Sequence, residues 1–128
     1  MDSWIIPCNV KYFDILTHVE KSKVIIWKKS AKIQEGDKVY IYVGTPYKEV
    51  KYRCIVDSIN VDEQTLQTNS YAIRDNYDHT NTYMKLIVEK EYNQGISMKK
   101  LQDLGMFMVR KQTRLYGTLL DYIQSFDQ

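Results

Sequence analysis

The sequence predicts an α+β domain in which short helices flank a sheet of about five to six strands. Two observations support this fold class. Several segments alternate apolar and polar residues with the period of two that strands show, and 38–44 is the clearest of them. Two other segments, one near each end of the chain, carry apolar residues at helical spacing. At 128 residues, the whole of 1–128 is expected to be one domain.

The N-terminal part is predicted to contain two short strands with a helix between them. Residues 4–8 form an apolar run that ends near Pro7, and 24–27 form a second run. Asn9 stands where the N-cap of the intervening helix is expected. The apolar residues of this helix are Tyr12, Ile15, Leu16 and Val19.

A β-hairpin is predicted over residues 38–59. Gly36 precedes it in a turn, where a glycine adopts positive φ easily. The first strand alternates, with Val39, Ile41 and Val43 on one face and Lys38, Tyr40 and Tyr42 on the other, as in a half-buried strand. The loop 45–48 then leads into the return strand 49–59.

The C-terminal half is predicted to contain one more strand and two helices. The polar stretch 62–81 is interpreted as a long functional loop or an irregular edge. Residues 83–92 alternate again and should close the sheet. Ser97 is expected to cap a short helix that Gly105 ends. A last helix, from about 113 to 126, presents an apolar stripe that should pack on the sheet: Leu115, Leu119, Tyr122, Ile123 and Phe126.

Charge and composition narrow the function classes. The segment 21–53 holds nine Lys or Arg against three acids, whereas 57–93 holds seven acids against three basic residues. A basic face of this kind suits a polyanion, although ordinary solvated lysines explain it equally well. With no membrane span and no secretory signal, we expect a cytoplasmic protein with no membrane partner. In that compartment Cys8 and Cys54 are expected to be free, buried thiols.

No motif with a catalytic rationale occurs in the sequence. It lacks a phosphate-binding glycine loop, a Cys-x-x-Cys pair, a His-Glu-x-x-His motif and a Gly-x-Ser-x-Gly elbow. His18 and His79 have no second ligand nearby in the sequence, so neither a metal nor a cofactor is expected. Acidic residues are abundant, but their spacing singles out no acid–base pair. We therefore expect a binding module and no catalytic residues.

Aromatic residues beside cations form the most informative pattern. Eleven Tyr, two Trp and three Phe are present, and several flank Lys or Arg, an arrangement that suits stacking on bases with phosphate contacts nearby. For most of the tyrosines, strand propensity is a sufficient explanation. Trp27 differs, because it stands at the end of a strand and is followed by Lys28, Lys29 and Ser30. So large a side chain with a polar N–H is not needed merely to fill a core at such a position.

The order of these segments resembles EVE domains. The resemblance is carried by Trp4–Asn9, an amphipathic helix, Ile25–Ser30 and Glu35–Gly44, and it covers residues 3–60 best. The related YTH and ASCH domains share this plan. It implies a PUA-like mixed β-barrel with a concave pocket that receives an extruded, often modified, base of DNA or RNA.

The resemblance also implies roles for particular residues. Trp27 would form one wall of an aromatic cage, with Tyr71 or Tyr77 as the opposite wall. Cys8 and Asn9, after the first strand, would line the pocket, although N-capping explains Asn9 without any ligand. Ser30 and Tyr42 complete the expected base pocket. Phosphate contacts are expected from Lys28, Lys29, Arg110, Lys111 and Arg114.

The leading hypothesis is thus a module that recognises an extruded, modified base of DNA or RNA. Two alternatives stay open. ASCH relatives include hydrolases, so an enzyme acting on modified nucleosides is the first. The second is a protein-interaction regulator that uses the tyrosine-rich face.

Overall fold

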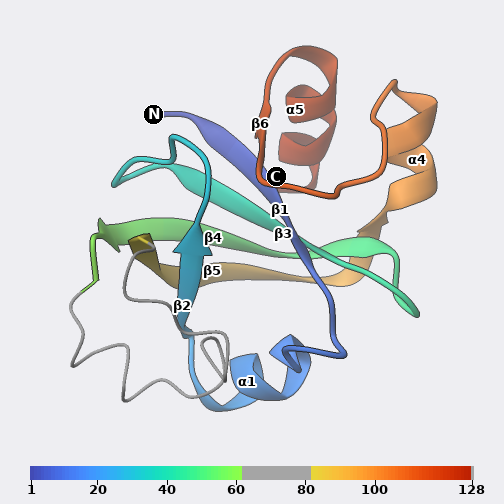
Figure 1. The fold of residues 1–128 in the computed structure, drawn as a ribbon. Helices are drawn as coiled ribbons and strands as arrows, with labels where there is room; N and C mark the ends of the chain where they lie inside the picture. The colour runs from blue at the N-terminus through green and yellow to red at the C-terminus, as the bar shows by residue number, and fades with distance from the viewer. Residues whose placement is uncertain (62–81, 128) are drawn as a thin grey trace.

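The fold is a six-stranded mixed sheet with short helices on both sides (Figure 1). The computed structural model describes residues 1–61 and 82–127. The strands are β1 (Ser3–Cys8), β2 (Val24–Lys29), β3 (Lys38–Val43), β4 (Glu49–Ile59), β5 (Thr82–Ser97) and β6 (Thr113–Leu115). The helices are α1 (Ile15–Lys21), α4 (Met98–Asp103) and α5 (Gly117–Gln124), and a 3-10 turn, Ser125–Asp127, follows α5. The α+β class that the sequence predicts is confirmed.

The sheet is curled but has two edges. Its strand order is β2-β5-β4-β3-β1-β6, in which only β1 and β3 run parallel. Within the described residues no strand pairing joins β2 to β6, so the expected barrel is left open along one seam. The mixed barrel-like arrangement is otherwise as expected, and the open seam becomes important for the candidate site.

The predicted hairpin is present as β3 and β4, which pair antiparallel. Gly36 adopts the expected positive φ of 89° in the turn before β3. The expectation of a half-buried β3 is wrong, because Tyr40 and Tyr42 are buried, as are the apolar residues on the opposite face of the strand. The cause is a second apolar layer, since α4 and α5 cover the face of the sheet that the tyrosines occupy (Figure 1).

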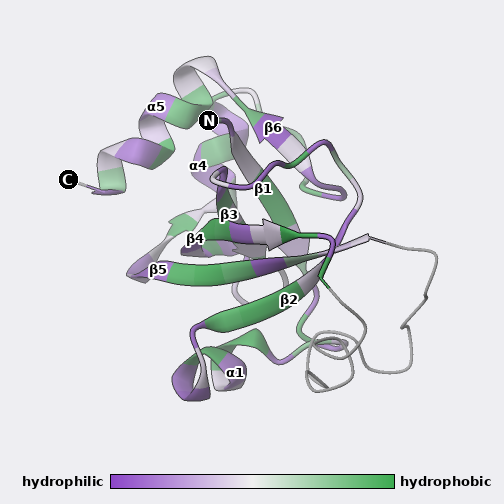
Figure 2. Ribbon diagram, turned by 90° about the vertical axis from the view of Figure 1, so that its left-hand side faces the viewer, coloured by the Kyte–Doolittle hydropathy of each residue, from purple (hydrophilic) through white to green (hydrophobic). Residues whose placement is uncertain are grey.

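Two apolar clusters therefore lie on opposite faces of the sheet. One includes Ile25, Ile41 and Phe13 and packs against α1. The other includes Tyr40, Leu101 and Ile123 and packs against α4 and α5. In Figure 2 the strands carry long apolar stretches, and α1 lies on one side of them with α4 and α5 on the other. Burying both faces explains how so short a chain builds a stable domain.

Two local expectations need correction. The N-cap of α1 is Asp14, which accepts from the Thr17 N–H at 3.3 Å, and not Asn9. Asn9 instead closes a preceding turn by accepting from the Lys11 N–H at 3.0 Å. At the other end, Thr113–Leu115 is a strand that pairs with β1, so the last helix starts only at Gly117.

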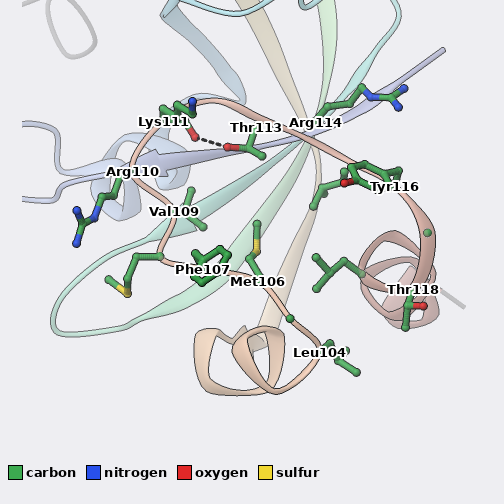
Figure 3. A pocket seen from close by; sticks show the side chains of 15 residues that line it. Leu104, Met106, Phe107, Val109, Arg110, Lys111, Thr113, Arg114, Tyr116 and Thr118 are labelled. Atoms are coloured by element: carbon green, nitrogen blue, oxygen red, sulfur yellow. Dashed lines mark hydrogen bonds between the residues drawn. The ribbon is translucent and has the colours of Figure 1, made fainter.

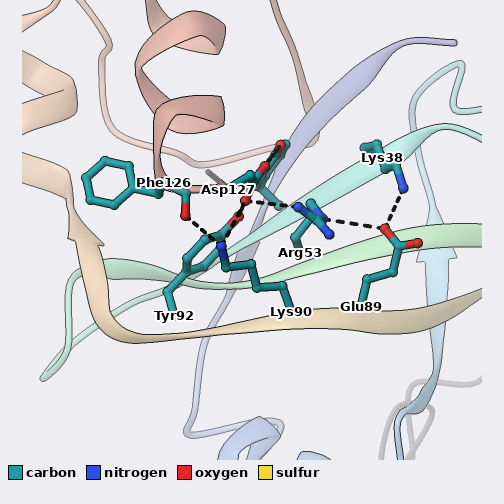
Figure 4. Close-up of polar contacts among 8 residues, drawn as sticks. Lys38, Arg53, Glu89, Lys90, Tyr92, Phe126 and Asp127 are labelled. Carbon is teal, nitrogen blue, oxygen red and sulfur yellow. Dashed lines mark hydrogen bonds and ion pairs between the residues drawn. The ribbon is translucent and has the colours of Figure 1, made fainter.

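Asp127 binds the end of the described chain to the face of the sheet that α4 and α5 cover (Figure 4). Its carboxylate accepts hydrogen bonds from the Tyr92 hydroxyl at 2.6 Å and the Tyr40 hydroxyl at 3.2 Å, and lies 3.0 Å from Arg53 Nη1. Lys90 donates to the Phe126 carbonyl at 2.6 Å. These contacts hold α5 against β3, β4 and β5.

Candidate functional site

A cleft opens where the two edge strands approach each other. We call it the seam cleft; it has a volume of about 260 Å³. This is close to the lower end of the range for small-molecule pockets, which suits one planar ring better than a large ligand. Its lining residues are Pro7, Trp27, Lys28, Ser30, Arg110, Lys111 and Gln112.

Gln112 builds the cleft by joining the ends of β2 and β6 through its side chain. Its Oε1 accepts from the Ser30 N–H at 2.9 Å and the Ala31 N–H at 3.2 Å, and its Nε2 donates to the Lys28 carbonyl at 2.7 Å. One side-chain amide thus replaces the strand pairing that the seam lacks. It also holds Arg110 and Lys111 beside Trp27.

Trp27 is half-buried, because it packs against the core and also lines the cleft. On β2 it shares a face with Ile25, so the strand alternation directs it toward the α1-side cluster. Its ring meets Phe13 edge to face, with the ring centroids 5.5 Å apart. Trp27 also lines the seam cleft. Such a ring is held rigidly while offering aromatic surface to a ligand.

The cleft is positively charged. Lys28, Arg110 and Lys111 line it and are exposed, and no carboxylate lies among the seven lining residues taken from the described chain. Ser30 contributes a hydroxyl at the rim, and it too is exposed. The combination of one aromatic wall, one hydroxyl and three cations suits a planar group that carries an anion beside it.

The structure brings together five of the residues singled out from the sequence: Trp27, Ser30, Lys28, Arg110 and Lys111. The two remaining phosphate candidates do not line the seam cleft. Lys29 donates to the Ala31 carbonyl at 2.9 Å, and Arg114 lies 3.4 Å from Asp2 and over the Tyr116 ring.

Three of the expected base-pocket residues do not line the seam cleft. Cys8 is buried in the core, with its Sγ 3.6 Å from the Phe13 carbonyl oxygen. Burial and, to a smaller extent, the charge of Asp14 raise the pKa of the Cys8 thiol to about 12. Asn9 is exposed in its turn. Tyr42 is buried on the other face of the sheet, where burial raises its pKa.

Tyr71 and Tyr77, the candidates for a second aromatic wall, lie outside the described residues. Two cleft residues, Pro7 and Gln112, were not singled out from the sequence. In the parts of the chain that are described, no group of three or more His, Cys, Asp or Glu could hold a metal ion. No helix in those parts is both long and apolar enough to cross a membrane.

Comparison with known proteins identifies the fold. No protein-family model and no curated protein sequence matches the chain. Solved structures do match. The ASCH protein of Zymomonas mobilis superposes with a TM-score of 0.71 at 17% identity, covering 97% of this chain and 94% of that protein. Human THYN1, solved in complex with DNA that contains 5-methylcytosine, gives 0.68 at 10% identity and covers 100% and 98%.

A protein of Leishmania major gives a TM-score of 0.68 at 14% identity, covering 99% of this chain and 94% of that one. Matches over nearly the full length of both chains show that this chain has the PUA-like fold of the ASCH and EVE type. The fold that the sequence resemblance implies is confirmed. At these identities the likeness extends to the fold alone.

Proposed function

We propose that this protein binds nucleic acid and holds one extruded base against Trp27 in the seam cleft. The observation that carries the proposal is the meeting of an indole with Lys28, Arg110 and Lys111 in a cleft about the size of one planar ring. The complex of human THYN1 with DNA containing 5-methylcytosine adds support, because that protein has the same fold.

The energetics are favourable for such a site. Extruding a base costs a few kcal/mol, and stacking on an aromatic ring contributes about 1–3 kcal/mol per base. Hydrogen bonds at the cleft rim and ion pairs between phosphates and Arg110 or Lys111 would supply the rest. A damaged or already single-stranded base costs least to extrude, so single strands are the first substrates to test.

A modified base is the proposed ligand, in DNA or RNA. One buried methyl group contributes about 0.8 kcal/mol, which corresponds to roughly a four-fold preference. A larger preference requires polar contacts that also differ between the modified and plain base. We therefore expect a preference of several fold for the 5-methylated form over plain cytosine.

The direct test compares wild type with Trp27→Ala and Trp27→Phe. Affinities for single-stranded DNA and RNA carrying cytosine or 5-methylcytosine are measured by fluorescence anisotropy, with circular dichroism to check folding. We expect Trp27→Ala to weaken binding by about ten-fold or more and Trp27→Phe to weaken it less. Tyr12→Ala is the matched control, because Tyr12 is 64% exposed and lines none of the cavities described here. Equal affinity of wild type and Trp27→Ala would defeat the base-pocket proposal.

The hydrolase alternative predicts a different result. The seven described residues that line the cleft include no carboxylate, imidazole or thiol, the groups that most often act as general bases. This favours binding over catalysis at that cleft. Incubation with acylated or alkylated nucleosides is therefore expected to leave them intact, and turnover that Lys28→Ala abolishes would reverse the assignment.

A further inference from the structure

A second, larger groove runs along the segment between α4 and α5. We call it the α4–α5 groove; it has a volume of about 880 Å³ and is lined by residues 104–111 and 113–119. Arg110 and Lys111 lie at one end of it, and Leu104 and Thr118 lie at the other (Figure 3). Its volume is at the upper end of the range for ligand pockets, so it has room for several chemical units in a row.

Three large apolar side chains are exposed in the groove. Phe107 is 88% exposed, Tyr116 is 69% exposed and Met108 is 51% exposed, and all three line the groove. Val109 and Leu115, on the same two segments, are buried and anchor them to the core. The exposed rings thus contribute little to folding, and an exposed apolar patch of this kind marks an interaction site.

Charge indicates the chemistry of the occupant. Arg110, Lys111 and Arg114 line the groove, and its fifteen lining residues include no Asp or Glu. Of these cations, Arg114 also lies 3.4 Å from Asp2, at an exposed position where such a pair is weak. Aromatic surfaces edged by cations and free of carboxylates suit a polyanion with planar groups, as in single-strand-binding proteins.

The groove and the seam cleft share a wall, because Arg110 and Lys111 line both. A phosphate held by either cation would therefore lie close to both cavities. A strand that places one base beside Trp27 would have its neighbouring phosphates at this shared wall. Its next bases would then be beside Phe107 and Tyr116.

We propose that the α4–α5 groove binds the nucleotides that flank the extruded base, by stacking bases on Phe107 and Tyr116. This inference depends on the proposed function, because the strand is positioned by its base in the seam cleft. Stacking of this kind tolerates any sequence, since every base has an aromatic face. The seam cleft would select the base, and the groove would supply sequence-independent affinity.

The test separates the groove from the cleft by ligand length. One probe is 5-methyldeoxycytidine monophosphate, which can fill only the cleft, and its binding is followed by NMR chemical-shift perturbation. The other is a single-stranded DNA of about ten nucleotides with one central 5-methylcytosine, followed by fluorescence anisotropy. The variant is Phe107→Ala combined with Tyr116→Ala, and Tyr12→Ala is the matched control.

We expect the double variant to bind the oligonucleotide about ten-fold more weakly or worse, while its affinity for the mononucleotide is unchanged. Trp27→Ala should weaken both probes. If the mononucleotide binds and the double variant keeps full oligonucleotide affinity, the groove inference is wrong and the proposed function stands. If an acidic amphipathic peptide occupies the groove in place of the oligonucleotide, the groove inference is wrong and the proposed function still stands. If the wild type binds neither probe, both are wrong.

Discussion

Gln112 donates a hydrogen bond from its Nε2 to the Lys28 carbonyl at 2.7 Å, across 84 positions of sequence. With the two bonds that its Oε1 accepts from Ser30 and Ala31, this contact joins the two edges of an otherwise open sheet. The cleft beside Trp27 exists because the joint is a side chain. Continuous strand pairing would bring the two backbones about 4.8 Å apart along the whole seam.

Removing this joint should loosen the cleft. Gln112→Ala loses three hydrogen bonds to the main chain and should lower the free energy of unfolding by about 1–3 kcal/mol. Oligonucleotide affinity should fall with it, because Arg110 and Lys111 are no longer held beside Trp27. Urea unfolding and anisotropy titrations measure the two effects.

Two further variants test whether the amide geometry matters. Gln112→Glu keeps an acceptor for Ser30 but cannot donate to Lys28 when ionised, so it should impair both properties. Gln124→Ala, at an exposed position of α5, is the control and should change neither. Unchanged stability in Gln112→Ala would mean that the seam is held by other contacts.

Phosphate contact by Lys111 can be recognised from the salt dependence of binding. Each phosphate contact that is lost reduces the slope of log affinity against log salt by about one. We expect Lys111→Ala to weaken binding of all sequences alike and to make the slope shallower by about that amount. Lys21→Ala, exposed on α1, is the matched control and should keep the wild-type slope. A wild-type slope in Lys111→Ala would exclude Lys111 from the phosphate contacts.

Much of the fold could be predicted because the alternation of apolar residues is strong where the sheet is central. The β3–β4 hairpin and α4, capped by Ser97, appear where they were expected. The strand β6 could not be separated from the helix after it, since three residues are too few to show a period of two. The face of β3 that carries Tyr40 and Tyr42 is buried because α4 and α5 cover it. The sequence of β3 alone does not indicate that these helices pack there.

The candidate site was predictable where aromatic and basic residues are adjacent in sequence. Trp27 and Lys28 stand out in this way. Gln112 carries no such signal, because its partners are main-chain atoms that any residue supplies. A shift of one residue also matters in a strand: Pro7 lines the cleft, whereas its neighbour Cys8 points to the opposite side, into the core.

The two cysteines should be inert in the folded protein. Both are free and buried, and burial is the main cause of the raised pKa of each thiol, to about 12 for Cys8. Because the thiolate is the reactive form, reaction with Ellman's reagent at pH 8 should be slow in the native state. In denaturant both thiols should react promptly. Fast reaction of one thiol in the native protein would mean that it is accessible, and Cys8→Ser would identify which.

Asp127 should make part of the stability depend on pH. Burial opposes its ionisation, but hydrogen bonds from Tyr92 and Arg53 and the charge of Arg53 outweigh burial and hold its pKa below the ordinary value of 3.8. Because folding lowers the pKa, the carboxylate stabilises the fold above about pH 4, and this contribution is lost as the pH falls through the lowered pKa. At pH 7, Asp127→Asn should cost about 2 kcal/mol of unfolding free energy, since an amide binds Tyr92 and Arg53 more weakly.

The measurement is urea unfolding of wild type and Asp127→Asn between pH 7 and pH 2.5. The difference in unfolding free energy should be constant near neutral pH and should shrink below about pH 4. Asp121→Asn, an exposed carboxylate on α5, is the matched control and should show little difference from wild type at any pH. A difference that does not change with pH would mean that Asp127 acts through packing and not through its charge. In that case Tyr92→Phe, which removes one donor to the carboxylate, should have little effect on stability.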